Sequence, residues 1–144
     1  MNPLWFAVPI VVGFCHPIIL QMSVRVSRVT GEMESAIVLH IVGAAVGFLW
    51  FFSGYRGLGL VALKAIPWWA YLAGAIGVTC LAATNRAMPM IGVAGFCAIA
   101  IASQLLMALA FDHFGLMGAT TKSIGSTHIF GAVCLVVGAI CVTR

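Results

Sequence analysis

Polar residues that interrupt long apolar runs are the ones that could do chemistry in this sequence. The stretch GFCHPIILQ, residues 13–21, places His16, Pro17 and Gln21 inside such a run. An imidazole can exchange a proton near neutral pH, a proline removes a backbone hydrogen bond, and a glutamine amide needs hydrogen-bond partners. At about 100° per residue, Gly13, Pro17 and Gln21 follow one drifting helical stripe, while His16 lies at its margin. We therefore predict a kinked helix that faces a cavity, with Gln21 as its main polar group.

A second polar group lies in the run around residues 100–112. Gln104 shares a helical face with Ala100 and Ala108, which leave room around its amide. Because an amide in lipid would lack hydrogen-bond partners, this face should turn toward other helices or toward water. Two interpretations are open: a wall of a substrate pathway, or an interhelical hydrogen bond worth about 0.6 kcal/mol on average in membranes.

The three acidic residues of the chain all fall near the ends of apolar runs. Glu32 and Glu34 precede the second run, where they suit the positive end of a helix dipole. Asp112 closes the fourth run; it could couple transport to protons, as could His16, or simply end a helix at the membrane interface. No carboxylate lies deep in the first run.

Two glycine pairs indicate close helix packing. Gly43 and Gly47 form a GxxxG pair on the face that also carries His40, which we expect to be packed and hydrogen-bonded. Gly131 and Gly138 are seven residues apart in the last run. Their stripe fits either a dimer interface or packing within one subunit.

Other polar residues suggest local structural roles. Asn85 is expected to cap the end of the third helix, Arg86 to reach lipid headgroups, and His128 to make a local polar contact near the start of the last helix. The four histidines lie on separate segments, and the five cysteines lack paired metal-site spacing. The sequence therefore predicts no metal, no cofactor and no enzymatic activity.

Composition requires a lipid bilayer around these residues. Of 144 residues, 63% are hydrophobic and 7% are charged, with a mean hydropathy of +1.17. A soluble domain has about a quarter of its residues charged. The net charge of +4 is scattered, which argues against nucleic acid as a partner. The first run lacks the features of a cleaved signal peptide and is expected to stay as a span.

Five apolar runs predict an all-α membrane protein, with one five-helix transmembrane domain over residues 1–144. Trp50, Trp68 and Trp69 suit the membrane interfaces. Lysine and arginine are almost balanced between the two sides, so single and dual orientation both stay open. The predicted spans are about 3–24, 34–53, 67–86, 90–111 and 124–143.

Several stretches together resemble one family of membrane transporters. The most specific is Gln21 followed by SQLLMALAFDHFGL at 103–116; the others are VGAAVG at 42–47, PWWAYLAGAIG at 67–77, Pro89 to Gly92 and GAVCLVVGAI at 131–140. They are similar to the YdcZ-type five-helix family of the drug/metabolite transporter superfamily, half-size relatives of small multidrug resistance transporters. Arg25 and His40 depart from the family pattern, so no family role is carried to them.

The resemblance implies a secondary transporter for a small organic solute, working by alternating access in a bacterial inner membrane. A half-size chain needs a second copy, which could be antiparallel, or a sister chain to enclose a pathway. Two alternatives remain: a small ion channel or exporter, and a non-transporting partner subunit of a sister membrane protein.

Overall fold

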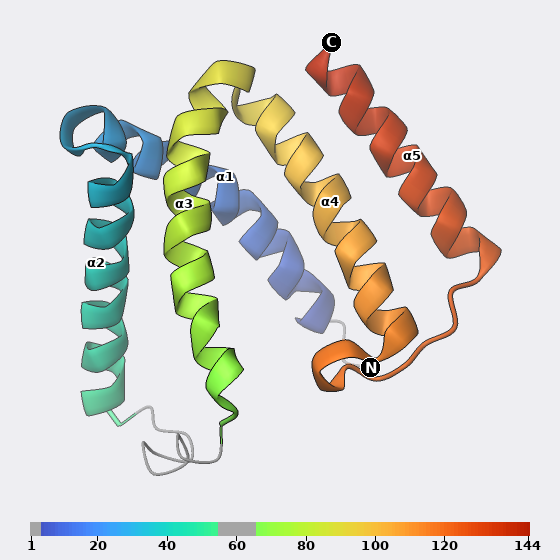
Figure 1. The fold of residues 1–144 in the computed structure, drawn as a ribbon, viewed down its shortest axis with the longest axis horizontal. Coiled ribbons are helices and arrows are strands. Elements are labelled where there is room, and N and C mark those ends of the chain that lie inside the picture. The colour runs from blue at the N-terminus through green and yellow to red at the C-terminus, as the bar shows by residue number, and fades with distance from the viewer. Residues whose placement is uncertain (1–3, 55–65) are drawn as a thin grey trace. The chain divides into compact units, whose positions relative to one another are not determined.

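The computed structural model describes residues 4–54 and 66–144, with side chains described from residue 8 onward. This part of the chain is helical and contains no strand, as predicted (Figure 1). Four of its helices, α1, α2, α4 and α5, have the length and hydropathy of a membrane span. The α-helices are α1 (Leu4–Thr30), α2 (Glu32–Phe52), α3 (Leu72–Ile91), α4 (Val93–Phe114) and α5 (Ser126–Thr143), with short 3-10 helices η2 (Trp68–Tyr71) and η3 (Leu116–Gly118).

The helix boundaries differ from the predicted spans at two turns. Helix α1 continues past the predicted end at residue 24, because no glycine or proline interrupts residues 25–30. The hydroxyls of Ser27 and Thr30 bond back to carbonyls of the same helix. It stops only at Gly31, whose φ of 106° is accessible to glycine and strained for other residues. Gly92, with a φ of 80°, is likewise the one residue between α3 and α4. Single glycines therefore set both turns.

The third helix is also shifted along the chain. The sequence predicts it over 67–86, but it is observed at Leu72–Ile91, preceded by the 3-10 turn of η2. Pro89 lies inside it near its end, so this proline does not terminate the helix. The shift moves Asn85 and Arg86 from the predicted helix end into the helix interior.

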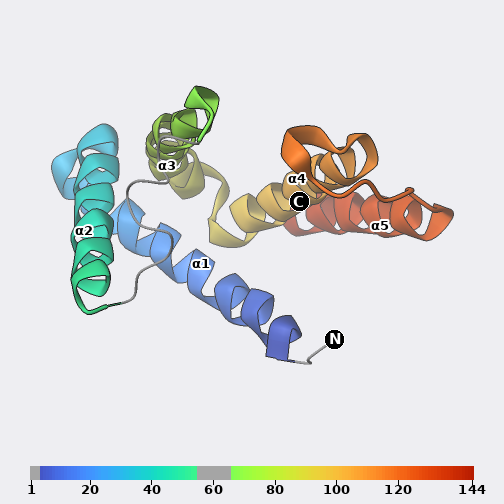
Figure 2. The ribbon, with the colours of Figure 1, turned by 90° about the horizontal axis from the view of Figure 1, so that it is seen from below.

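The chain divides into two compact units, Met1–Pro89 and Met90–Arg144, each described by itself. The prediction of a single domain stays a prediction. In the first unit α1 packs against α2 near the Gly31 turn, and the N-terminal half of α1 diverges from α2 (Figures 1 and 2). Helix α3 runs beside α2 in the opposite direction (Figure 1).

In the second unit α4 and α5 form an antiparallel pair (Figure 1). Ala102 of α4 and Ala132 and Ala139 of α5 are buried, and such small residues let two helices approach closely. After α4 the chain turns at Gly115, which is in the left-handed conformation, and the Lys122 amide then donates to the Asp112 carbonyl at 2.8 Å. This bond holds the connecting segment against the C-terminal end of α4.

Candidate functional site

A cluster of buried polar side chains joins the three helices of the first unit. Ser23 of α1, Ser35 of α2 and Asn85 of α3 are 0%, 0% and 3% exposed, and they are the buried polar residues of the described part of the chain. The Ser23 hydroxyl donates to Asn85 Oδ1 at 2.6 Å, and the Ser35 hydroxyl donates to the Ser23 carbonyl at 3.0 Å. We call these three residues the polar joint.

The polar joint extends to the first turn of α2 through its backbone. The Asn85 amide donates from Nδ2 to the Glu32 carbonyl at 3.1 Å, so one side chain ties α3 to both helices of the hairpin. Asn85 is thus not the helix cap that the sequence suggested, because α3 continues past it to Ile91. A polar residue beside a predicted helix end looks like a cap until its distant partners are known.

An ion pair lies next to this amide. Arg86 Nη1 is 3.3 Å from Glu32 Oε1, and the two side chains are 75% and 44% exposed. Exposed pairs contribute between about 0 and 1 kcal/mol, so this contact adds little to what Asn85 provides. Glu32 also lies in the first turn of α2, as expected for a dipole-stabilising carboxylate.

The Gly31 turn brings the members of the polar joint together. With only one residue between α1 and α2, Ser23 and Ser35 meet across the hairpin. A Cβ on Gly31 would collide with the Glu34 carboxylate, which folds back over the turn. Within the described residues every buried side-chain nitrogen and oxygen has a partner. The polar joint is therefore a closed structural contact, and open polar groups must be sought elsewhere.

Helix α1 carries four of the predicted pathway residues, and they lie beyond the polar joint toward the N-terminus. Gly13, His16 and Gln21 are exposed and Pro17 is partly buried. At about 100° per residue, His16 continues the buried face of Leu20, whereas Gln21 lies about 100° away from it. Gly13 and Pro17 lie within about 60° of Leu20 as well, so His16 stays at the margin of this stripe.

The Gln21 side chain makes no hydrogen bond within the described residues, nor does His16. Gly13 has open space where a Cβ would be. This half of α1 therefore offers an open surface with one amide and one imidazole. Its role in a pathway stays a prediction.

One face of α2 contacts α3 at His40 and has no neighbour among the described residues further along, at Gly43 and Gly47. His40 Nδ1 is 2.7 Å from the Ala36 carbonyl, and a Cβ on Gly77 of α3 would lie 3.4 Å from His40 Nε2. His40 is therefore hydrogen-bonded and lies against α3, as the sequence suggested, although the residue stays accessible. Gly43 and Gly47, further along α2, have open space where a Cβ would be, with no described atom within 4 Å.

The predicted residues on α4 lie on the face that α5 does not cover. The α5-facing side of α4 carries Ala102 and Leu106. At the helical increment per residue, both lie about 160° from Gln104 around the axis. Gln104 and Ala108 are exposed, Ala100 is half-buried, and the Gln104 amide makes no hydrogen bond within the described residues. The second unit therefore leaves this amide open on its own surface.

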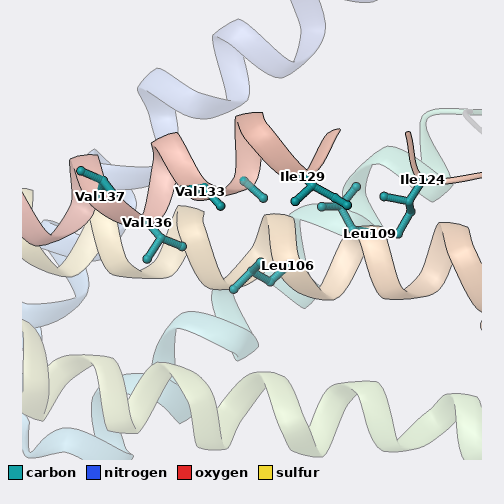
Figure 3. A pocket seen from close by; sticks show the side chains of 8 residues that line it. Leu106, Leu109, Ile124, Ile129, Val133, Val136 and Val137 are labelled. Carbon is teal, nitrogen blue, oxygen red and sulfur yellow. The ribbon is translucent and has the colours of Figure 1, made fainter. Parts of the chain in front are cut away.

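An apolar cavity of about 330 Å³ lies between α4 and α5. Figure 3 shows its lining, from Leu106 and Leu109 on α4, Ile124 before α5, and α5 itself. A second cavity, of about 320 Å³, continues toward Thr143. The pair thus meets through aliphatic side chains and small residues, and no buried polar side chain lies between its helices in the described structure. The remaining lining residues of the first cavity are Ile129, Ala132, Val133, Val136 and Val137.

The glycine pair of α5 turns away from this cavity. At the helical increment per residue, Gly131 and Gly138 lie roughly 150° around the axis from Val136. Val136 lines both cavities, and nothing lies within 4 Å of a Cβ on either glycine. The two glycines therefore do not mediate the contact with α4. Their partner stays a prediction.

The remaining titratable groups are local. Asp112 is partly buried in the last turn of α4, and its backbone carbonyl holds Lys122. The Gly125 amide donates to His128 Nδ1 at 3.1 Å, which is the local contact expected for that histidine. Among the described residues no three His, Cys, Asp or Glu side chains gather where they could hold a metal ion.

The predicted pathway residues fall in both units: Gly13, His16, Pro17 and Gln21 in the first, Ala100, Gln104 and Ala108 in the second. Each group is open on its own unit. Sequence reasoning missed Ser23 and Ser35, whose only signal was a pair of hydroxyls flanking a glycine turn in an apolar context.

Comparison with known proteins agrees with this architecture. The family model described as "Putative inner membrane exporter, YdcZ" matches residues 4–141. The chain is 31% identical over 126 residues to the "Inner membrane protein YdcZ" of Escherichia coli (strain K12), an alignment that covers 85% of this chain and 83% of that protein. No solved structure matches the chain. With its apolar helices and this match along almost its whole length, the chain belongs to the YdcZ family of inner membrane proteins.

Proposed function

We propose that the chain is a subunit of a secondary transporter that exports a small organic solute by alternating access. One observation carries the proposal: Gln21 and Gln104 lie within membrane-spanning helices, are exposed, and make no hydrogen bond in the described structure. An amide in hydrocarbon without partners costs several kcal/mol. These side chains therefore need water, a solute or a second subunit beside them. A transport pathway enclosed by two subunits would provide such partners.

The residues around the two amides support a pathway that moves. Pro17 has no backbone N–H, so the Gly13 carbonyl loses its helical partner one turn earlier. Such a break provides a place for a helix to bend during alternating access. Ala100 and Ala108 flank Gln104 with small side chains, which leave space for a solute beside the amide.

The open glycines support a second subunit. Gly131 and Gly138 on α5, and Gly43 and Gly47 on α2, have free space above their backbones. In membranes such surfaces are where helices pair closely. We propose a homodimer, in parallel or antiparallel arrangement, or a heterodimer with a sister chain.

Proton coupling is a narrower part of the proposal. His16 is exposed within the α1 span, and Asp112 lies in the last turn of α4. Of the two, His16 is the better candidate, because it lies deep in a span whereas Asp112 lies near a helix end. The test is whether flux follows an imposed pH gradient and whether His16→Asn abolishes that response.

Reconstituted protein can test the pathway directly. Gln21→Leu combined with Gln104→Leu should reduce solute flux in liposomes at least about tenfold, which corresponds to about 1.4 kcal/mol. Met22→Leu combined with Ile101→Leu, two exposed positions on the same helices, is the matched control and should leave flux unchanged. Unchanged flux in the glutamine variant would refute the pathway. A gradient-driven current that does not saturate with solute would instead indicate a channel.

A further inference from the structure

The hydrogen-bonding side chains of the helices divide into those already bonded and those left open. Eight hydroxyls along the helices donate at 2.6–3.1 Å, six of them to a carbonyl of their own helix. Within the described helices, Ser23 and Ser35 are the hydroxyls that bond across to another helix, and both belong to the polar joint. A solute would have to compete with these bonds. The other hydroxyls in this set are Ser27, Thr30, Thr79, Thr84, Ser103 and Thr143.

Away from the first and last two turns of each helix, the side-chain amides and imidazoles left open in the described spans are two amides and one imidazole. Arg25 and Arg28 of α1 and Asp112 and His113 of α4 are also unbonded, but they lie nearer the helix ends. Gln21, Gln104 and His16 are exposed and have no hydrogen-bond partner in the described structure, whereas Asn85 and His40 are already bonded. An amide offers two donors and an acceptor with two lone pairs. The chemistry left for a solute is therefore mainly that of a neutral amide.

Charge gives the second constraint. All three carboxylates of the sequence lie within a turn of a helix end, and Glu32 is paired with Arg86. Helices α2, α4 and α5 contain no lysine or arginine. A charged solute at mid-membrane needs an opposite charge, because transfer of an unpaired ion into a low-dielectric interior is very costly. Neither sign of charge has such a partner beside Gln104 on α4.

We infer that the transported solute is uncharged and bears a carboxamide or an equivalent donor–acceptor group beside a small apolar body. The Gln104 amide offers the chemistry that recognises the polar group, and the alanines on either side of it accommodate the apolar part. This inference rests on the proposed transport function and adds the chemical class of its cargo. Hydrophobic cations and organic anions are excluded from that class.

Three probes of one shape test the class. Benzamide, benzoate and benzyltrimethylammonium share a phenyl ring and differ in charge, and their binding to the purified full chain in detergent can be measured by thermal shift. Benzamide should bind at least about tenfold more tightly than either charged probe. Gln104→Leu should remove most of this preference, and Met22→Leu should keep it.

A variant that gains a charge tests the class by a change of preference, which a general loss of binding would not produce. Gln104→Glu keeps the side-chain shape but supplies the missing carboxylate, so it should shift preference from benzamide toward benzyltrimethylammonium. Tighter binding of a charged probe by the unmodified chain, absence of binding by all three probes, or no shift in Gln104→Glu would each overturn the inference.

Flux measurements separate this inference from the proposed function. Benzamide binding that depends on Gln104, without saturable solute flux in liposomes, would leave the recognition chemistry standing and refute transport. Saturable flux of charged solutes alone would support transport and refute the neutral class.

Discussion

The helices inside each of the two units are held together by different kinds of contact. In the first, Ser23, Ser35 and Asn85 connect three helices through buried hydrogen bonds around a one-residue turn. In the second, α4 and α5 meet through alanines and aliphatic side chains and leave two apolar cavities between them. Hydrogen bonds require particular distances and directions, whereas apolar contacts tolerate sliding.

The difference indicates which helix contacts have a fixed geometry and which can shift. Lipid tails are as apolar as the side chains of α4 and α5, so these helices gain little from the hydrophobic effect and depend on packing. The polar joint has no comparable substitute in lipid, because its groups would lose their partners. We therefore expect the first unit to keep its hairpin geometry while the second rearranges.

The strongest way to break the first unit is to substitute its turn. Residue 31 needs a conformation that strains any side chain, and a Cβ there would meet the Glu34 carboxylate. Gly31→Ala should therefore destabilise the chain by about 2 kcal/mol, the usual cost of such backbone strain. The free energy of unfolding in mixed micelles measures this. Adding Glu34→Ala should recover only part of the loss.

Gly74→Ala is the control for this prediction. Gly74 lies in α3 with nothing within 4 Å of a Cβ. Alanine favours a helix by about 1 kcal/mol over glycine, so this substitution should leave stability unchanged or raise it slightly. An equal loss at Gly31 and Gly74 would mean that the turn has no special role.

Removal of the Asn85 amide should have the next largest effect. Asn85→Leu leaves the Ser23 hydroxyl and the Glu32 carbonyl without their partner. Loss of these buried hydrogen bonds should cost about 1.5 kcal/mol in the free energy of unfolding. A double-mutant cycle with Ser23→Ala should give a coupling energy of about 1 kcal/mol.

Thr84→Val is the matched control, because the Thr84 hydroxyl bonds only within α3. It should change the free energy of unfolding by less than about 0.5 kcal/mol. A loss at Thr84 as large as that at Asn85 would contradict a special role for bonds between helices.

The stability of the second unit should depend on how well its apolar cavities are filled, because no buried polar side chain lies between its described helices. Val136 lines both cavities. Val136→Ile should stabilise the α4–α5 pair by about 0.5 kcal/mol through added van der Waals contact, measured as the free energy of unfolding. Val142→Ile, at an exposed position that lines neither cavity, should have no effect. Destabilisation by Val136→Ile would show that the space is already occupied.

The smallest effect is expected for the exposed ion pair between Glu32 and Arg86. A double-mutant cycle between Glu32→Gln and Arg86→Gln should give a coupling energy below about 0.5 kcal/mol, which salt reduces further. A coupling above about 1 kcal/mol, the upper end for exposed pairs, would place this pair inside the polar joint rather than beside it.

Local patterns predict most of the helices but not the contacts among them. Hydropathy predicts five helices, and Gly125 lies directly before α5, close to the predicted start. The capping role predicted for Asn85 is wrong because α3 continues past it. Its partner Ser23 is 62 residues away, and no local pattern reports such a pairing. Likewise, the stripe of Gly131 and Gly138 is readable from spacing, but spacing does not say which helix covers it.

The α1 stripe illustrates a second limit. The drift from Gly13 to Gln21 favours the glutamine as the inward residue, on the assumption that unusual residues share one face. Burial centres on Leu20 and Val24, and from their midpoint Gly13 and Pro17 lie within about 40°, while His16 and Gln21 lie about 60° and about 80° away on opposite sides. Which side of a helix is inward depends on its neighbours, so it follows from the tertiary fold.

The helix lengths have a consequence for the surrounding bilayer. Helix α1 has 27 residues and α5 has 18 residues. At the rise of an α-helix they are about 40 Å and about 27 Å long. A hydrocarbon layer is about 30 Å thick, so the end of α1 that carries Arg25 and Arg28 extends into the headgroups, or α1 tilts, while α5 favours a locally thinner membrane. The two helices therefore match hydrocarbon layers of different thickness. Lipids with longer acyl chains should create a mismatch at α5 before they create one at α1.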